Sequence, residues 1–252
     1  MSTTSTIHIE RGCVVISGGS KGLGEKLARG FLAEGRRVAT FSRNASTFTR
    51  EMAETDPLQE RFFWNPIDIN DLNQIHGFID ATVKHFGQIE VLVNNAAALI
   101  EGLLPLSRDV DIENLIHTNL LAPIILTKEC SRVMLRTGNG VILHISSINS
   151  VRGHRGVSIY SATKAAMDGF TRSLAREFGP SNIRVNSIAP GFFDSELVTG
   201  QSPERRQQIA RRTPLGRVSQ IEEIADVALF LCSSKATFIT GQTIIVDGGI
   251  TC

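Results

Sequence analysis

The sequence predicts an α/β protein built around one doubly wound, seven-stranded parallel sheet flanked by helices. Two observations carry this prediction. Short runs rich in β-branched and aromatic residues alternate with longer segments of helical periodicity over the whole chain. Most of these runs are apolar throughout, which is typical of parallel strands that are buried on both faces. Because strand–helix alternation implies right-handed crossovers, the strands are expected to lie parallel to one another.

The expected strands follow one another along the chain. They span residues 13–17, 37–42, 62–67, 91–94, 141–146, 184–189 and 243–246. The segments between them with helical periodicity are residues 22–34, 45–56, 71–86, 109–136, 158–179 and 220–232. In the helix at 158–179, apolar residues recur at helical spacing as far as Phe178, and Gly179-Pro180 then ends it.

No composition break, repeat or low-complexity tract divides the chain, so residues 1–252 are expected to form a single domain. Residues 191–217 depart from the alternation, and an insertion after a strand in such a fold is a natural lid over a site. The segment carries four arginines, for which a solvated helix face is favoured over contact with a cofactor phosphate or an anionic substrate: Arg205, Arg206, Arg211 and Arg212.

Charge and composition argue against several classes of protein. The 26 basic and 25 acidic residues give a net charge of +1, which leaves no footprint for nucleic acid or for an anionic membrane. The four cysteines are scattered and form no C-x-x-C pair, and no metal site is expected. Residues 1–12 lack the apolar core of a signal peptide, and no apolar run is long enough to span a bilayer. A cytoplasmic protein is therefore expected.

A glycine-rich turn follows the first expected strand and precedes the first helix. It contains, in order, Gly18, Ser20, Lys21, Gly22, Leu23 and Gly24, with the spacing G-x-x-x-G-x-G. Because free backbone N–H groups and the helix dipole point at such a junction, it is expected to bind the diphosphate of a dinucleotide. The same residues fit a G-x-S-x-G hydrolase elbow around Ser20, but too few residues precede the strand to supply the upstream strands that this elbow needs.

The end of the second strand indicates which nicotinamide cofactor is used. An enzyme that uses NAD places Asp or Glu there to bind the ribose 2′-hydroxyl, whereas this chain has Ser42-Arg43. Arg43 can hold a 2′-phosphate in a bidentate way, and Lys21 in the glycine turn adds a second cation. Both cations could instead be ordinary surface residues, but the pattern favours NADP(H).

A serine, a tyrosine and a lysine form the most informative constellation in the chain. Tyr160, the only tyrosine, and Lys164 lie at i and i+4, so they share one face of a helix. Ser147 lies at the end of the preceding strand, where a sheet presents residues to a crevice. An ammonium group near a phenol is expected to lower the pKa of the phenol. Tyr160 could then deliver a proton to the alkoxide that hydride transfer to a ketone creates, while Ser147 holds the same oxygen. The alternative is a tyrosine that only packs, beside an exposed lysine.

With these motifs in order along nearly the whole chain, the sequence resembles the short-chain dehydrogenase/reductase family, and in particular its 3-oxoacyl-[acyl-carrier-protein] reductases. The residues that carry the likeness are Ser17–Gly24, Asp68-Ile69, Asn94–Ala97, Asn119, Ser147, Tyr160, Lys164, Pro190-Gly191 and Asp247–Gly249. The resemblance implies a Rossmann domain. It also implies that Asn119 holds a water linking Lys164 to solvent, and that the chain forms a homotetramer.

The resemblance also extends the expected sites. Besides the turn, Ser42 and Arg43, the cofactor would contact Asp68, Ile69, Asn95, Ala96, Tyr160, Lys164, Pro190, Gly191 and Phe193. The substrate would contact Ser147, Asn149, His154, Tyr160 and Phe192, and the expected pocket walls are mostly apolar. His144, in an apolar strand, is expected to be a core residue instead of an acid or base.

Two departures from the family pattern stand out. Ala97 replaces the last glycine of N-N-A-G, and its methyl group would narrow the site near the nicotinamide. The places where carrier-protein reductases often have basic residues read Gly138–Gly140 and Pro180–Asn182, which weakens the case for docking of a carrier protein.

The leading hypothesis is an NADPH-dependent oxidoreductase that reduces a ketone to a secondary alcohol. A 3-oxoacyl or polyketide-like carbonyl is the favoured substrate, either free or bound to a carrier protein. One alternative is an alcohol or steroid-type dehydrogenase that uses the same residues in the oxidative direction. A non-catalytic NADP-binding protein is the alternative from another class, and the presence of Asn119, Ser147, Tyr160 and Lys164 argues against it.

Overall fold

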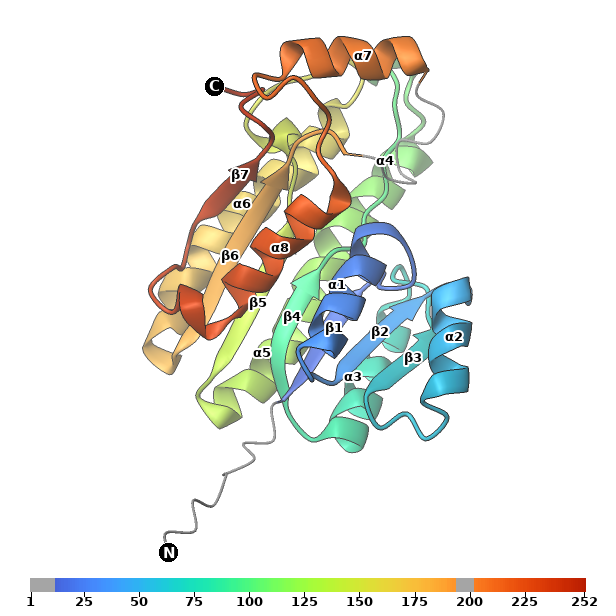
Figure 1. Cartoon of the computed structure of the whole chain (residues 1–252), viewed down its shortest axis with the longest axis vertical. Coiled ribbons are helices and arrows are strands. Elements are labelled where there is room, and N and C mark those ends of the chain that lie inside the picture. Colours follow the sequence, from blue (N-terminus) through green and yellow to red (C-terminus); the bar gives the residue numbers. More distant parts are fainter. Residues whose placement is uncertain (1–11, 194–201) are drawn as a thin grey trace, which may run out of the picture.

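The structure is a computed structural model that describes residues 12–193 and 202–252. These residues form a seven-stranded, all-parallel sheet with helices on both faces (Figure 1). The strands are β1 Cys13–Ser17, β2 Val38–Ser42, β3 Phe62–Pro66, β4 Ile89–Asn94, β5 Gly140–Ile145, β6 Ile183–Pro190 and β7 Thr243–Val246. The predicted fold class is confirmed, and each strand end lies within two residues of its predicted position.

The order of the strands places a crevice at the middle of the sheet. The strands lie in the order β3-β2-β1-β4-β5-β6-β7, so the chain winds outward from β1 to β3 and then returns to lay β4 on the other side of β1. Val14 of β1 is paired with Val38 of β2 on one side and with Val91 of β4 on the other. In open α/β sheets the connections diverge at such a switch point, which leaves a crevice at the carboxyl ends of the two strands.

The helices cover the two faces of the sheet in separate groups. They are α1 Gly22–Ala33, α2 Thr47–Thr55, α3 Leu72–Phe86, α4 Asp109–Ile116, α5 Ala122–Thr137, α6 Ser158–Phe178, α7 Pro203–Arg212 and α8 Ile221–Cys232. Helices α1, α2 and α8 pack on one face, and α3, α5 and α6 pack on the other. In β1, Val14 and Ile16 belong to the first layer, while Cys13 and Val15 belong to the second. Because both layers are apolar, the strand is apolar throughout.

One predicted helix is interrupted. In place of a continuous helix at 109–136, a π-helical turn at His117–Leu121 separates α4 from α5. Pro123 offers a physical reason, since it has no N–H to donate to the carbonyl of Asn119 and its ring crowds that carbonyl. Isolated π-turns inside helices occur frequently at functional sites. The helix α7 adds to the six predicted helical segments and carries the four arginines for which a helix face was favoured.

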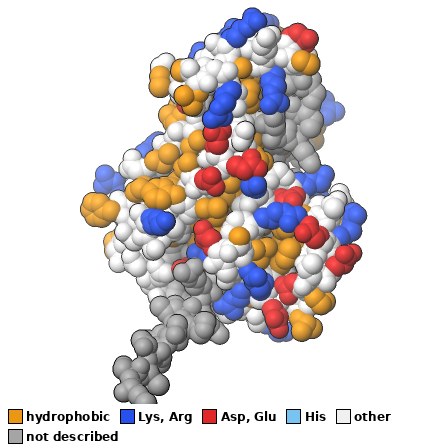
Figure 2. Space-filling model, viewed as in Figure 1, with side chains coloured by type: hydrophobic (Ala, Val, Ile, Leu, Met, Phe, Trp, Pro, Cys, Tyr) orange, Lys and Arg blue, Asp and Glu red, His pale blue; other side chains and the backbone are white. Residues whose placement is uncertain are grey.

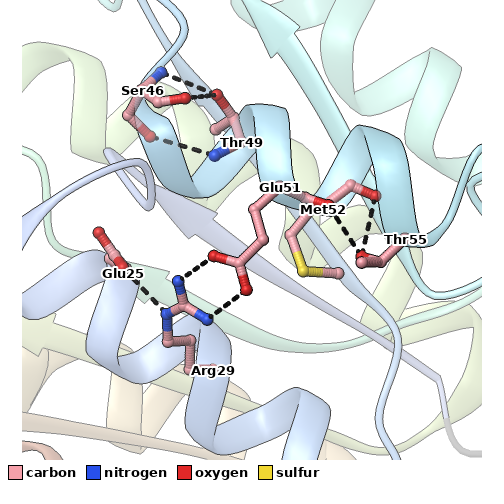
Figure 3. Close-up of polar contacts among 7 residues, drawn as sticks. All are labelled: Glu25, Arg29, Ser46, Thr49, Glu51, Met52 and Thr55. Carbon is pink, nitrogen blue, oxygen red and sulfur yellow. Dashed lines mark hydrogen bonds and ion pairs between the residues drawn. The ribbon is translucent and has the colours of Figure 1, made fainter.

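Polar contacts fix the start of α2 and tie it to α1 (Figure 3). At the start of α2, Ser46 and Thr49 form a capping box, in which the Ser46 hydroxyl accepts from the Thr49 N–H at 3.2 Å. The Arg29 guanidinium lies between the carboxylates of Glu25, at 2.9 Å, and Glu51, at 2.6 Å. These ion pairs are exposed and contribute little stability each. They link α2 to α1 at the surface.

The surface carries no single dominant sign of charge on the face drawn in Figure 2, where acidic and basic side chains are interspersed over most of the molecule. Basic side chains gather at the upper end of that view, where α7 lies.

Among the residues that the structure describes, no helix is both long and apolar enough to cross a membrane. The four cysteines are all free, and three of them are buried.

Candidate active site

A cleft of about 1060 Å³ runs along the carboxyl ends of the strands. It is lined by every residue predicted to bind cofactor or substrate except Ser20, and by every predicted catalytic residue except Asn119. Both exceptions are buried next to the cleft wall, Ser20 with 6% of its surface exposed and Asn119 with 1%. The tertiary structure therefore brings together residues from six separate parts of the chain.

The glycine turn is packed so closely that side chains are excluded from it. A Cβ atom on Gly24 would lie 2.2 Å from the carbonyl oxygen of Gly18, and Gly18 itself has a φ of +69°. The amide of Asn95, at the end of β4, donates to the carbonyl oxygens of Ser17 and Gly18 at 3.0 and 3.2 Å. The turn is thereby held against β4, with the first residues of α1 facing the cleft. This is the geometry that a phosphate group needs at a helix N-terminus.

Another part of the cleft is lined by residues at the carboxyl ends of β2 and β3. Ser42 is the last residue of β2 and Arg43 follows it, and Asp68 and Ile69 come after β3. The Ser42 hydroxyl accepts from the indole N–H of Trp64 at 2.9 Å, which anchors this turn to β3. The Arg43 side chain is exposed and lines the same cleft as Lys21 of the glycine turn. Two basic residues from different parts of the chain thus line this cleft.

Ser147 and Tyr160 line the cleft next to each other. Ser147 follows β5 and is 9% exposed, and its hydroxyl oxygen accepts from the Asn149 N–H at 3.2 Å. Tyr160 lies in the first turn of α6, and a hydrogen bond joins its phenol to Ser147. Ser147 lies at the carboxyl end of the sheet and Tyr160 lies on a helix, so the packing of α6 against the sheet sets the distance between the two hydroxyl groups.

Lys164 lies one turn further along α6 and is 4% exposed. Its ammonium donates to the carbonyl oxygen of Ile145 at 2.7 Å, and its Nζ lies 5.6 Å from the centroid of the Tyr160 ring. Burial lowers the pKa of Lys164 to about 8, although the carboxylate of Asp168 raises it in part. The prediction that Tyr160 and Lys164 share one helix face in the cleft is confirmed.

The predicted direction of the Tyr160 pKa is wrong. The nearby ammonium was expected to lower it, but burial raises the pKa of Tyr160 above its ordinary value, and the hydrogen bond with Ser147 offsets this only in part. The physical reason is that the phenol is desolvated, which disfavours its charged form. The Lys164 ammonium donates its short hydrogen bond to the Ile145 carbonyl and not to the phenol. The phenol is therefore fully protonated at neutral pH, which is the form that a general acid must have.

Asn119 connects the π-turn to the strand end and to α6. Its amide makes a reciprocal pair with Ala98, accepting from the Ala98 N–H and donating to the Ala98 carbonyl, both at 2.8 Å. A longer bond of 3.4 Å joins it to the hydroxyl of Thr163, which neighbours Lys164. Through these hydrogen bonds, Asn119 holds the segment that follows β4 next to α6.

The substrate end of the cleft combines apolar walls with a few polar groups. The ring of His154 meets the ring of Phe192 edge-on at 5.8 Å. The Asn149 side-chain oxygen is buried and has no hydrogen-bond partner among the described residues. A buried acceptor without a partner is costly unless something donates to it. This fits the prediction that Asn149 faces the substrate. His144, in contrast, is 1% exposed and lies in the core, as predicted.

The predicted lid at 191–217 is partly visible. Residues 194–201 of this segment lie outside the described residues, and they include most of the stretch 192–199 that was expected to form one wall of the substrate pocket. Phe193, near the start of this segment, pairs with Ser219, just after its end, and the Ser219 N–H donates to the Phe192 carbonyl at 3.1 Å. Arg205 of α7 lines the cleft, whereas Arg206, Arg211 and Arg212 do not.

Sequence reasoning missed part of the cleft. The segment between β4 and the π-turn contributes lining residues that no motif had indicated: Glu101, Gly102, Leu103, Asn114 and Thr118. These residues are brought to the cleft by the hydrogen bond from the Gly102 N–H to the Gly156 carbonyl at 2.8 Å and by the π-turn. Neither feature leaves a sequence pattern. Among the described residues, no cluster of His, Cys, Asp and Glu could hold a metal ion.

Comparisons with known proteins agree with this geometry. The family model described as Enoyl-(Acyl carrier protein) reductase matches residues 18–251. The chain is 34% identical over 237 residues to 3-oxoacyl-[acyl-carrier-protein] reductase FabG of Chlamydia muridarum, covering 94% of this chain and 96% of that protein. It is 36% identical over 236 residues to Carbonyl reductase family member 4 of Danio rerio, with the same coverage.

Solved structures give the same result. A gluconate 5-dehydrogenase from Burkholderia cenocepacia, in complex with NADP and tartrate, has a TM-score of 0.89 and 28% identity over 96% of each chain. The structure of ElxO with NADP bound has a TM-score of 0.87 and 30% identity, covering 95% of this chain and 98% of that one.

The fold, the cleft and these matches define an oxidoreductase of the Rossmann type. The chain belongs to the short-chain dehydrogenase/reductase family, and within it the chain is related to the 3-oxoacyl-[acyl-carrier-protein] reductases.

Proposed function

We propose that the protein reduces a ketone to a secondary alcohol with NADPH. The observation that carries the proposal is that Ser147, Tyr160 and Lys164 line the same cleft as the glycine turn. The cofactor, when bound, supplies the hydride. The protein's own residues must then bind the cofactor, hold the carbonyl group and deliver one proton to its oxygen.

The cleft fits a phosphorylated dinucleotide. A Cβ atom on Gly24 would fill the space beside the Gly18 carbonyl, so the turn leaves its backbone open to a diphosphate. Arg43 and Lys21 would bind the 2′-phosphate, and Asp68 and Ile69 would lie at the adenine. The middle of the cofactor would pass Asn95, Ala96, Pro190, Gly191 and Phe193, with Tyr160 and Lys164 at the nicotinamide ribose.

The catalytic residues divide the proton chemistry among them. The Ser147 hydroxyl donates to the carbonyl oxygen and fixes its position. The phenol of Tyr160, kept protonated by burial, gives its proton to the oxygen as negative charge develops there. The ammonium of Lys164 stabilises the phenolate that remains. Asn119 holds the neighbouring backbone in place, and we propose that it leads a water toward Lys164 so that the phenol regains its proton from solvent.

We infer a substrate with an apolar body and an anionic group far from the carbonyl. Asn149, His154 and Phe192 stand beside Ser147 in a part of the cleft with apolar walls. Arg155, in the loop before α6, and Arg205, in α7, line the cleft together with the acidic Glu101. Relatives named 3-oxoacyl-[acyl-carrier-protein] reductase support a 3-oxoacyl or polyketide-like thioester, either free or on a carrier protein.

We also propose that residues 1–252 act as one domain with a lid at 191–217, as a homotetramer in the cytoplasm. The exposed apolar side chains of Ile116, Leu121 and Leu135 lie on or between α4 and α5, where a second copy could cover them. Sedimentation or light scattering of the purified protein measures the oligomeric state.

The proposed reaction is tested by NADPH oxidation with a 3-oxoacyl thioester and the variant Tyr160→Phe. General acid catalysis contributes about a hundred- to ten-thousand-fold, so kcat should fall by that factor while NADPH binding, measured by thermal shift, is kept. Ser158→Ala, in the same turn of α6 but away from this cleft, is the matched control and should keep full rate. NADH in place of NADPH should raise KM. Full activity of Tyr160→Phe contradicts the mechanism.

A further inference from the structure

A buried carboxylate lies beneath the catalytic lysine, and the mechanism above does not use it. Asp168 is in α6, four residues after Lys164, so the two side chains share one face of the helix at about 5–6 Å between Cβ atoms. Asp168 is 5% exposed and Lys164 is 4% exposed. An acidic side chain is almost never buried to this extent unless something compensates its charge.

The contacts of Asp168 fix its place. Its Oδ1 accepts from the hydroxyl of Ser187 at 2.9 Å, and Ser187, in β6, is fully buried. Neither Asp168 nor Lys164 is in an ion pair within 4.0 Å in the parts of the chain that the structure describes. The carboxylate is thus held at a distance from the ammonium by β6, and the ammonium is held toward the cleft by Ile145.

In the described part of the chain, contacts also bring Tyr160 and His144 close to Lys164, and neither carries a charge at neutral pH. On α6 itself, burial raises the pKa of Tyr160 above its ordinary value. On β5, burial and the charge of Lys164 lower the pKa of His144 to about 3. Asn119 of the π-turn is hydrogen-bonded to Thr163, and Ser187 of β6 is hydrogen-bonded to Asp168; neither side chain titrates. Asp168 therefore supplies the negative charge that opposes loss of the lysine proton.

We propose that Asp168 is a positioning residue that keeps Lys164 protonated during the reaction, and that Ser187 holds the carboxylate in place for this purpose. The proposal rests on the proposed function, because the charge on Lys164 matters only if the lysine assists Tyr160. It differs from a purely structural role, since a structural hydrogen bond would be kept by an uncharged amide in the same position.

The direct test is the proton affinity of Lys164 in the variant Asp168→Asn. The side-chain ¹³Cε signal of Lys164, assigned by its loss in Lys164→Met, is titrated by NMR in the whole protein. An opposite charge at this range shifts a pKa by about 1–3, so the Lys164 pKa should fall by at least about 1 in Asp168→Asn. Glu177→Gln, which removes an exposed negative charge from the far end of the same helix, is the matched control and should leave it unchanged.

The second readout is the pH profile of kcat/KM for the ketone. In Asp168→Asn the basic limb should move down by the same amount, so the rate above the new pKa falls about tenfold per unit while the rate at low pH is kept. Asp168→Glu should restore most of the profile. Should Asp168→Asn not fold, Ser187→Ala gives the same test with a smaller shift in the same direction.

An unchanged Lys164 titration in both Asp168→Asn and Ser187→Ala overturns the proposal. A lowered Lys164 pKa with an unmoved pH profile also overturns it, because the charge would then play no part in the reaction. The NMR titration needs no turnover, so its result stands whether or not the wild-type protein reduces ketones. Absence of any ketone reduction by the wild type would instead be a failure of the proposed function.

Discussion

The substitution Lys164→Met is expected to abolish catalytic assistance and yet to stabilise the folded protein at neutral pH. Burial lowers the pKa of Lys164 from 10.5 to about 8. A base with a lower pKa in the folded state binds fewer protons there than in the unfolded chain, so stability rises with pH between these values. At 1.36 kcal/mol per pH unit, the buried ammonium costs the folded state about 3 kcal/mol at pH 7.

Two losses reduce the gain from removing the ammonium. The carbonyl of Ile145 loses its 2.7 Å hydrogen bond, and Asp168 loses the positive charge beside it. An unsatisfied buried carbonyl costs about 1 kcal/mol or more, so a net stabilisation of about 1–2 kcal/mol is expected at pH 7. Because methionine has no ammonium to deprotonate, this advantage should disappear as the pH rises from about 8 to above 10.

Urea unfolding of both proteins at a series of pH values measures the effect. The informative quantity is the difference between the two free energies of unfolding as a function of pH, since contributions from other groups cancel in it. The variant should be the more stable protein at pH 7 and lose this advantage by pH 10. A difference that does not change with pH, or that grows in favour of the variant at high pH, would refute the reasoning. NADPH oxidation by the variant should be lost in parallel.

Two further expectations concern stability and the glycine turn. Burial lowers the pKa of His144 from 6.5 to about 3, so its contribution to stability is lost as the pH falls through this window, by about 2–3 kcal/mol at pH 4.5. In His144→Gln the slope of unfolding free energy against pH should flatten between pH 6.5 and 4.5, and an unaltered slope would contradict the assignment. In Gly24→Ala the new Cβ would lie 2.2 Å from the Gly18 carbonyl oxygen, so a loss of about 1–3 kcal/mol and weaker NADPH binding by fluorescence titration are expected. Gly77→Ala in α3, with nothing within 4 Å, is the control and should be neutral or stabilising; equal effects at both positions would show that packing of the turn is not the cause.

Some features could be read from local sequence because their cause is local. The strands are apolar because helices cover both faces of the sheet, and each of the seven predicted runs is a strand. The glycine turn is recognisable because the φ of +69° at Gly18 favours glycine, and only glycine fits the close approach at Gly24. The shared face of Tyr160 and Lys164 follows from helical spacing alone.

Other predictions failed where the outcome depends on distant contacts. The helix at 109–136 was expected to be continuous because periodicity does not register the effect of one proline on a carbonyl four residues earlier. The direction of the Tyr160 pKa was wrong because spacing says that an ammonium is near but not that its hydrogen bond is made with Ile145, nor how completely the phenol is desolvated.

The sequence by itself determined the fold class, the family, the placement of the dinucleotide turn and the identity of the serine, tyrosine and lysine in the cleft, because each depends on a short stretch of residue types or on periodicity. Only the tertiary structure decided which charges the lysine meets, how Asn119 is used, and that Glu101, Leu103 and Arg205 line the cleft. These properties arise when α6, β6 and the segment after β4 pack together. Burial and distance between residues far apart in the chain are set by that packing and leave no local pattern.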